Sequence, residues 1–290
     1  MGRRVGAVTG SGQATLVVIG NCQAESLRLL LDADDVVTHR LPAVHELTAA
    51  DVVPLQRLLA RTDLFVGQPV GDDYRGLPVG TAQLVACLPP GARTALVPTV
   101  RYAGLHPYHL LVHPPGLEKP DPPAVPYHDV RTVLAAAGRS ALPPLTIEAV
   151  QAVADASVAE LDRRERQHDT VRVSDLLARP VAGSMRTINH PGNAVLEPLA
   201  ARLRAALGLD PRPPGVRREL LMSIHAPLLR EVVAAHGLDV DPTADWTVEG
   251  EAVPVETVTA AHLAWYAARP EMLAAALERA EPIAALLRGA

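Results

Sequence analysis

Residues 15–31 read TLVVIGNCQAESLRLLL, and this stretch decides the fold of the first part of the chain. The apolar, β-branched run 15–20 is typical of a strand that is buried on both faces of a parallel sheet. Directly after it, Ala24, Leu27, Leu30 and Leu31 recur at helical spacing. The segment therefore predicts a strand, a tight turn and a helix in direct succession.

The same alternation continues outward along the sequence. Strand-like runs at 35–41, 63–66 and 94–97 alternate with helical patterns at 49–61 and 80–88. Strands that alternate with helices favour an α/β fold, in which helices cover both faces of a parallel sheet in three layers.

The pattern changes at the proline-rich segment HPPGLEKPDPPAVP, residues 113–126. Beyond it we expect helices at 146–168, 193–207, 228–236, 255–268 and 272–287, and one strand at 217–224. The predicted organisation is a disordered extension (1–13), an α/β core (14–112), a proline-rich loop (113–126) and a mainly helical part (127–290).

Composition excludes several classes of protein. The 290 residues carry a formal net charge of −5, which argues against a general nucleic-acid binder, because such proteins gather basic charge against phosphates. Two cysteines cannot form a disulfide framework, and they indicate a reducing compartment. We see no signal peptide and no apolar run long enough for a membrane span, so we expect a cytoplasmic protein.

Cys22 is the first candidate for chemistry. It lies where a strand ends and a helix begins, which is the preferred ligand crevice of open α/β sheets. The helix dipole and the free N–H groups of the first turn lower the pKa of a thiol and stabilise an oxyanion, so this position suits a nucleophile. The alternative is a buried structural cysteine, the usual state of a free thiol. Cys87 is expected to be an inert core residue.

A thiol nucleophile needs a base, and His190 in the run TINHPGN (187–193) is the best candidate. It lies on a loop end before a helix, where Asn189 or Asn193 can orient its ring. The alternative is that His190 only caps the helix. His106 is the second candidate. The remaining histidines of polar context are expected to be solvated: His39, His45, His168, His236 and His262. No group of residues has the spacing of a zinc site, so no metal is expected.

Four further candidates lie near the ends of predicted strands or of a predicted helix. Gln68 lies at the end of the strand in LFVGQP, where its side-chain amide could donate to an oxyanion. The alternative, which the sequence favours equally, is that Gln68 is an ordinary turn residue between Gly67 and Pro69. Arg101 offers a guanidinium for phosphate and Tyr102 a ring for stacking on a base. Arg164, in a charged helix end, is ordinarily part of a solvated face, and a ligand role is the minority reading.

Taken together, these residues resemble the WcbI family, acetyltransferases of polysaccharide biosynthesis. The resemblance covers roughly residues 15–208 and rests on matching stretches in family order. They are VVIGNCQAESLRLLL (17–31), TDLFVGQPVGDDYRGLPVGT (62–81), VPTVRYAGLHPYH (97–109), LDRRERQHDTVRVSDLL (161–177) and MRTINHPGNAVLEPLAARL (185–203). The chain departs from the family pattern at Arg101-Tyr102 and at Gly192.

The resemblance implies a protein that binds coenzyme A or acetyl-coenzyme A and transfers the acyl group to a sugar hydroxyl. It implies a core related to esterase-like α/β sandwiches, with Cys22 in place of the usual serine and His190 as its partner. Asn21, Gln23 and Gln68 would position the oxyanion or acyl group. The residues expected to hold the cofactor are Arg101, Tyr102, His106, Arg164, Asn189 and Asn193. A cysteine-dependent esterase or thioesterase, and a non-catalytic coenzyme A-binding protein, remain alternatives, and the acceptor and oligomeric state stay open.

Overall fold

The computed structural model describes residues 13–114, 121–212, 216 and 218–289. The predicted disordered extension therefore lies outside the described residues except for Gln13, as does the middle of the proline-rich segment. The chain divides into two compact units. One holds Met1–Val97 and Ala200–Val216, the other Pro98–Leu199 and Arg217–Ala290. The boundary differs from the expected one, because the chain leaves the first unit at Val97, before the prolines, and returns to it in the middle of a later helix.

The first unit is built on a four-stranded parallel sheet. Its strands are β1 (Ala14–Ile19), β2 (Val36–Thr38), β3 (Leu64–Gly67) and β4 (Arg93–Leu96), in the order β2-β1-β3-β4. They alternate with α1 (Cys22–Leu31), α2 (Ala49–Leu59) and α3 (Thr81–Val85), and a short 3-10 helix, η1 (Tyr74–Gly76), precedes α3. The α/β fold predicted from the sequence is confirmed.

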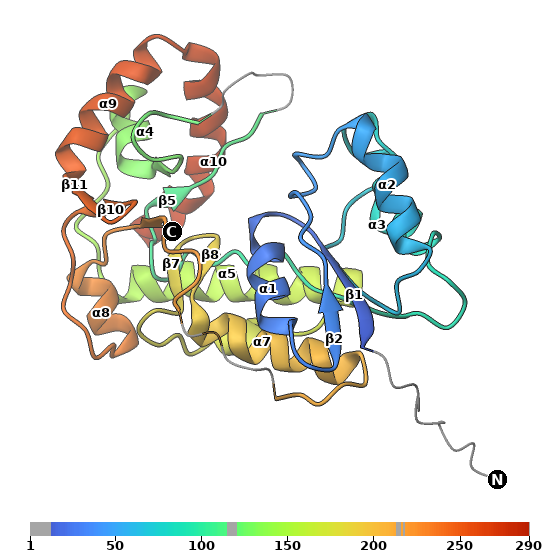
Figure 1. Cartoon of the computed structure of the whole chain (residues 1–290). Helices are drawn as coiled ribbons and strands as arrows, with labels where there is room; N and C mark the ends of the chain where they lie inside the picture. The colour runs from blue at the N-terminus through green and yellow to red at the C-terminus, as the bar shows by residue number, and fades with distance from the viewer. Residues whose placement is uncertain (1–12, 115–120, 213–215, 217, 290) are drawn as a thin grey trace. The chain divides into compact units, whose positions relative to one another are not determined.

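Side-chain alternation along β1 supplies both faces of the sheet. Val17 and Ile19 pack with Phe65 of β3 against Leu55 of α2 and Leu84 of α3. The opposite face of β1 carries the buried Leu16 and Val18. Helix α1, whose apolar stripe is also buried, covers this face. Helices thus lie on both sides of the sheet (Figure 1).

A buried arginine ties residues 200–216 to this unit. Helix α7 (Asn193–Ala206) carries Arg204, whose side chain is only 3% exposed. Its guanidinium donates to the carbonyl of Leu31 and forms a 2.6 Å ion pair with Asp35. This pair holds the end of α7 against the end of α1 and the start of β2.

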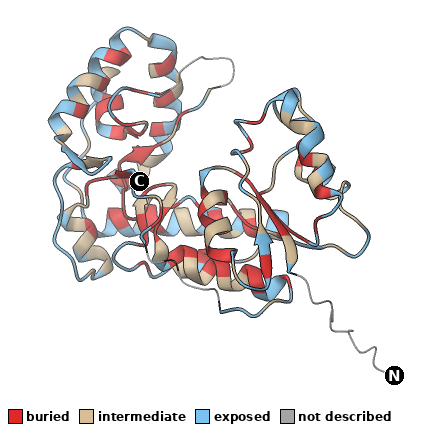
Figure 2. Ribbon diagram, viewed as in Figure 1, coloured by how far each residue is buried: buried red, intermediate tan, exposed pale blue. Residues whose placement is uncertain are grey.

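The second unit contains most of the helix. Its helices are α4 (Val130–Ala136), α5 (Ile147–His168), α6 (Ser174–Leu177), α8 (Arg230–His236), α9 (Val255–Ala267) and α10 (Pro270–Arg288), besides the start of α7. A stripe of small residues, Ala276, Ala280 and Ala284, lets α10 pack closely against Val130 and Val133 of α4. Figure 2 shows buried residues on the inner sides of these helices.

Short strands in this unit were not predicted. They are β5 (His109–Leu110), β6 (His128–Asp129), β7 (Met185–Thr187), β8 (His190–Pro191), β9 (Ile224–His225), β10 (Trp246–Val248) and β11 (Glu251–Val253). The prediction of a strand at 217–224 is wrong, since among the described residues of this segment the strand β9 contains only Ile224, followed by His225, and it pairs with β10. Strands of two or three residues are too short to show a period in the sequence. In the described ranges, no helix is long and apolar enough to cross a lipid bilayer.

Candidate functional site

The turn between β1 and α1 is fixed by Asn21. Its side-chain oxygen accepts a 2.9 Å hydrogen bond from the backbone N–H of Gln23, which makes Asn21 the N-cap of α1. Cys22 is the first residue of the helix and is exposed. The expected strand, turn and helix therefore place Cys22 at a helix N-terminus.

Gln68 lies directly beside this turn. The pairing of Ile19 with Gly67 brings the ends of β1 and β3 together, and the backbone N–H of Gln68 donates to the carbonyl of Ile19 at 3.0 Å. The side-chain oxygen of Gln68 accepts from the backbone N–H of Asn21 at 2.8 Å, and its amide nitrogen lies 3.4 Å from the side-chain oxygen of Gln23. In the strand order β2-β1-β3-β4, the chain passes from β1 to β2 on one side and then to β3 on the other side of β1. The carboxyl ends of β1 and β3 therefore form the topological switch point of the sheet, where α/β proteins bind ligands.

Gly20 is required by the close approach of Gln68. A Cβ at position 20 would lie 2.5 Å from the side-chain oxygen of Gln68, which is itself buried and hydrogen-bonded. We expect Gly20→Ala to displace Gln68 and to lower the free energy of unfolding by about 1–3 kcal/mol. Chemical denaturation measures the loss. Gly71→Ala is the matched control, because nothing lies within 4 Å of its Cβ; an equal loss there would contradict the prediction.

The electrostatics at Cys22 differ from the expectation. Desolvation raises the pKa of the Cys22 thiol, and the nearby Glu46 raises it as well. The backbone N–H groups of Cys22 and Gln23 lower it, as those of a helix N-terminus should, but their effect is smaller than that of desolvation. The net result is a thiol pKa above its ordinary value. Cys22 is therefore a protonated thiol near neutral pH and needs a base before it can act as a nucleophile.

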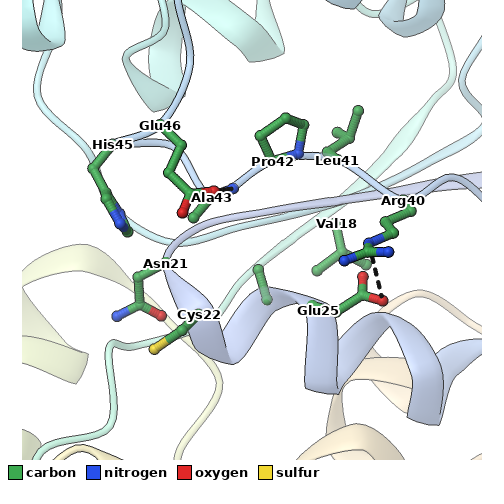
Figure 3. A pocket seen from close by; sticks show the side chains of 11 residues that line it. Val18, Asn21, Cys22, Glu25, Arg40, Leu41, Pro42, Ala43, His45 and Glu46 are labelled. Carbon is green, nitrogen blue, oxygen red and sulfur yellow. Dashed lines mark hydrogen bonds and ion pairs between the residues drawn. The ribbon is translucent and has the colours of Figure 1, made fainter.

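A pocket of about 620 Å³ opens beside Cys22 within the first unit. Its floor is the start of α1, with Asn21 and Cys22, and its other wall is the loop of residues 40–46. Figure 3 shows His45 on the Asn21 side of the pocket and Arg40 facing Glu25, with 3.9 Å between Nε of Arg40 and Oε1 of Glu25. The backbone N–H of Val44 donates to the carbonyl of Gly20 at 2.7 Å, which holds the loop against the turn.

His190 belongs to the second unit and lies on β8, where it pairs with Thr187 of β7. Burial, together with smaller effects of the nearby His225 and Arg186, lowers the pKa of His190 to about 4. The imidazole is therefore neutral near pH 7, the form that accepts a proton. Its ring meets Tyr127 edge-on at 6.3 Å between centroids.

The two asparagines beside His190 are engaged in structural hydrogen bonds. The side-chain oxygen of Asn189 accepts from the hydroxyl of Tyr127 at 2.7 Å. The side-chain oxygen of Asn193 accepts from the backbone N–H of Leu220 at 3.0 Å, and its amide donates to the carbonyl of Arg218 at 3.1 Å. Gly192 between them is required, because a Cβ there would lie 1.9 Å from the carbonyl oxygen of Gly183.

Arg101 and Arg164 lie near each other in the second unit, together with Arg279 of α10. Desolvation lowers the pKa of Arg101, and Arg279 lowers it further. The pKa of Arg164 is lowered by desolvation and by Arg101, while Glu160 opposes the shift. No carboxylate in the described part of the chain forms an ion pair with Arg101 or Arg279. Arg101 therefore feels the positive charge of both Arg164 and Arg279, while Arg164 is also paired with Glu160 at 3.4 Å. We call these three residues the cationic cluster, and a bound anion would be favoured there.

Tyr102 and His106 have different surroundings from those expected. Tyr102 is 1% exposed and its hydroxyl packs over Gly104, so its ring is not available to stack on a base. His106 is 4% exposed, with Nδ1 3.2 Å from the carbonyl of Pro227 and Nε2 3.5 Å from that of Met185. Both side chains support the fold of the second unit in this structure.

Sequence reasoning missed several residues at these places. Arg279 was assigned to an ordinary helix, and no local signal could have found it, since its partners lie more than a hundred positions away. The prediction that His45 is solvated is confirmed, since His45 is exposed, and it also lines the pocket beside Cys22. The same prediction for His262 is wrong, because His262 is only 1% exposed. Across the ranges that the structure describes, no three His, Cys, Asp or Glu side chains are arranged to hold a metal ion.

Comparisons with known proteins agree with this architecture. The family described as polysaccharide biosynthesis enzyme WcbI matches residues 15–212. A solved structure of WcbI superposes on this chain with a TM-score of 0.70. It is described as a novel polysaccharide biosynthesis enzyme, in its native form without a disulfide bond between coenzyme A and a cysteine. The two chains are 19% identical, and the match covers 93% of this chain and 99% of the other. No curated protein matches the sequence.

The family match covers more than half of the chain, including the turn at Cys22, Gln68 and the segment around His190. The chain belongs to the WcbI family of polysaccharide biosynthesis enzymes.

Proposed function

We propose that this enzyme transfers an acyl group from a coenzyme A thioester to a hydroxyl group of a sugar, a polysaccharide precursor or a related natural product. The observation that carries the proposal is the position of Cys22, exposed at the N-terminus of α1 at the switch point of the sheet and beside a pocket of about 620 Å³. The solved WcbI structure supports the use of coenzyme A, because it is described as the native form without a disulfide bond between coenzyme A and a cysteine of that protein.

The chemistry begins with the thiol of Cys22. After loss of its proton, the sulfur attacks the carbonyl carbon of the thioester, the bond between that carbon and the sulfur of coenzyme A breaks, and coenzyme A leaves as its thiol after taking up a proton. The acceptor hydroxyl then gives up its proton to the base, and its oxygen attacks the acyl carbon. The bond between that carbon and the sulfur of Cys22 breaks, the ester product leaves, and the Cys22 sulfur takes back a proton from the base. Backbone N–H groups of the first turn of α1 are the donors proposed for the oxyanion. In this structure Gln68 and Asn21 hold that turn, while Gln23 follows Cys22 within it.

The phosphates of coenzyme A are proposed to bind the cationic cluster of Arg101, Arg164 and Arg279. Guanidinium groups bind phosphate oxygens in pairs and remain charged at all working pH values. A bound diphosphate would offset the mutual repulsion that these three side chains now carry.

Trapping the acyl-enzyme tests the proposal directly. Incubation with acetyl-coenzyme A and no acceptor should add one acetyl mass to the intact protein, and peptide mapping should place it on Cys22. Release of coenzyme A that depends on a sugar acceptor would distinguish a transferase from a thioesterase, which needs only water. Turnover by a chain that never carries the added mass would exclude the covalent step.

His190 is the proposed base, and its pKa gives a test. Because the neutral imidazole accepts the proton, kcat/KM should be level from about pH 5.5 upward and should fall as the pH falls through about 4. His190→Gln should lower kcat/KM in the pH range where it is level by about a hundredfold or more, and it should remove the fall in kcat/KM at acid pH. Far-UV circular dichroism at each pH separates this limb from unfolding. An acid limb near the ordinary histidine pKa of about 6.5 would contradict the assignment.

A further inference from the structure

A second pocket, of about 250 Å³, lies wholly within the second unit. It is smaller than the range of about 300–1,000 Å³ typical of sites for drug-sized ligands, so its occupant is of the size of a single sugar ring. None of the chemistry proposed above uses it.

One wall of this pocket is a face of helix α9. Val255, Val258, Thr259 and His262 line the pocket, and their spacing of three and four residues places them on the same side of the helix. The Nε2–H of His262 donates to the carbonyl oxygen of Pro123 at 3.0 Å, which holds the ring in place. Thr259 lines the pocket with a hydroxyl-bearing side chain beside the apolar Val255 and Val258.

Charged residues on a rigid support also line the pocket. His109 of β5 and Asp129 of β6 are directly paired across the two strands, with Nε2 of His109 3.9 Å from Oδ2 of Asp129. Asp129 caps helix α4 by accepting from the backbone N–H of Arg131 at 2.8 Å and binds the guanidinium of Arg131 at 2.6 Å. That guanidinium lies 4.1 Å above the ring of Tyr108, so all four side chains are fixed.

An aromatic stack also lines the pocket. The ring of Trp246 lies between His109, at 4.7 Å, and Tyr127, at 5.7 Å between centroids. Trp246 is only 3% exposed and lines the pocket. His109 is 7% exposed, and its Nδ1 has no hydrogen-bond partner in the described part of the chain, an unusual state for a buried ring nitrogen.

The charge balance of the pocket selects against anions. Burial lowers the pKa of His109 to about 3 and that of His106 to about 4, and it also lowers the pKa of His262, so all three rings are neutral near pH 7. The one cation, Arg131, is already paired with Asp129, and Glu256 adds a second carboxylate. A phosphate or carboxylate ligand would meet net negative charge, whereas hydroxyl groups could donate to the carboxylates.

We propose that this pocket binds a neutral, hydroxyl-rich ring, a single monosaccharide unit, through the carboxylate of Asp129 and the hydroxyl of Thr259. The inference concerns binding alone and does not depend on the acyl transfer proposed above. It gives the second unit a carbohydrate site of its own.

Intrinsic fluorescence tests the proposal, because one of the two tryptophans, Trp246, lines the pocket. Methyl glycosides of glucose, mannose and galactose, titrated without coenzyme A, should give a saturable change for at least one of them. Glucuronate, glucose 6-phosphate and inorganic phosphate should bind at least about tenfold more weakly. Trp246→Phe should remove the fluorescence change, while saturation-transfer NMR still detects the bound glycoside.

Asp129→Asn is the decisive variant, because the amide keeps the oxygen that caps α4 but loses the charge. It should weaken glycoside binding by about tenfold or more. Thr259→Val, which has a nearly equal shape, should weaken it less and serves if Asp129→Asn fails to fold. Asp241→Asn, which lines a different pocket, is the matched control and should bind as the parent does. Saturable binding by none of the three glycosides, an anionic sugar that binds as tightly, or an equal loss in Asp241→Asn would overturn the proposal.

Discussion

Replacing Cys22 with alanine should lower acyl transfer by about a thousandfold or more while leaving the fold intact. Loss of a nucleophile removes the covalent route entirely, and such losses are among the largest that single substitutions cause in enzymes. Alanine is tolerated at this position, because residue 22 is exposed at the first position of α1 and alanine is a good helix former. Steady-state release of coenzyme A in the presence of acceptor measures the effect.

Two further variants make the result specific. Cys22→Ser keeps the geometry but offers a less reactive nucleophile, so it should retain more activity than alanine. Cys87→Ser is the matched control, since Cys87 is half-buried and its thiol donates to the carbonyl of Gln83 at 3.4 Å, away from the pocket. Its activity should stay near that of the parent. Full activity in Cys22→Ala would leave direct transfer, or a role in binding alone, as the function of this position.

The first unit could be predicted well because its signals are local. A β-branched run, an N-capping asparagine and an apolar stripe lie within residues 15–31, and each determines structure over a few neighbouring positions. Gln68 was found for the same reason, since the ends of neighbouring parallel strands meet at one edge of the sheet. Its contact with Asn21 follows from the register of β1 and β3.

The second unit could be predicted only in part. Its long helices show a clear period, but the pairing of His109 with Asp129 depends on two-residue strands that carry no pattern. The division of the chain within α7 was also hidden, because the helix is continuous across the boundary. Burial of His262 depends on which face of α9 packs inward, and the polar context of the sequence suggested the opposite face.

The pKa of Cys22 illustrates a different limit. The sequence predicts the helix N-terminus, which lowers the pKa, but it does not reveal how far the thiol is desolvated or that Glu46 lies close by. Desolvation opposes the dipole and has the larger effect here. The local motif therefore identified the position of the thiol correctly but gave the wrong direction for its pKa.

The cationic cluster yields the second large prediction. Arg279→Ala should raise the dissociation constant for coenzyme A by about tenfold to a hundredfold, since hydrogen bonds to charged groups contribute about 1.5–3 kcal/mol. Arg279 lies exposed on α10, where alanine favours the helix, so the loss should come from charge rather than from unfolding. Isothermal titration calorimetry measures the constant, and thermal denaturation confirms that the variant is folded.

Salt and a truncated ligand identify which groups the cluster binds. The affinity of the parent for coenzyme A should fall with added sodium chloride more steeply than that of Arg279→Ala, because exposed ion pairs are screened. Dephospho-coenzyme A lacks the 3′-phosphate. If Arg279 binds that phosphate, Arg279→Ala should weaken the binding of dephospho-coenzyme A less than it weakens the binding of coenzyme A. If Arg279 binds the diphosphate, the substitution should weaken the binding of both ligands equally. Arg163→Ala is the matched control, because Arg163 neighbours Arg164 but is exposed and paired with Glu160. If Arg279→Ala binds coenzyme A as tightly as the parent, the phosphates bind elsewhere.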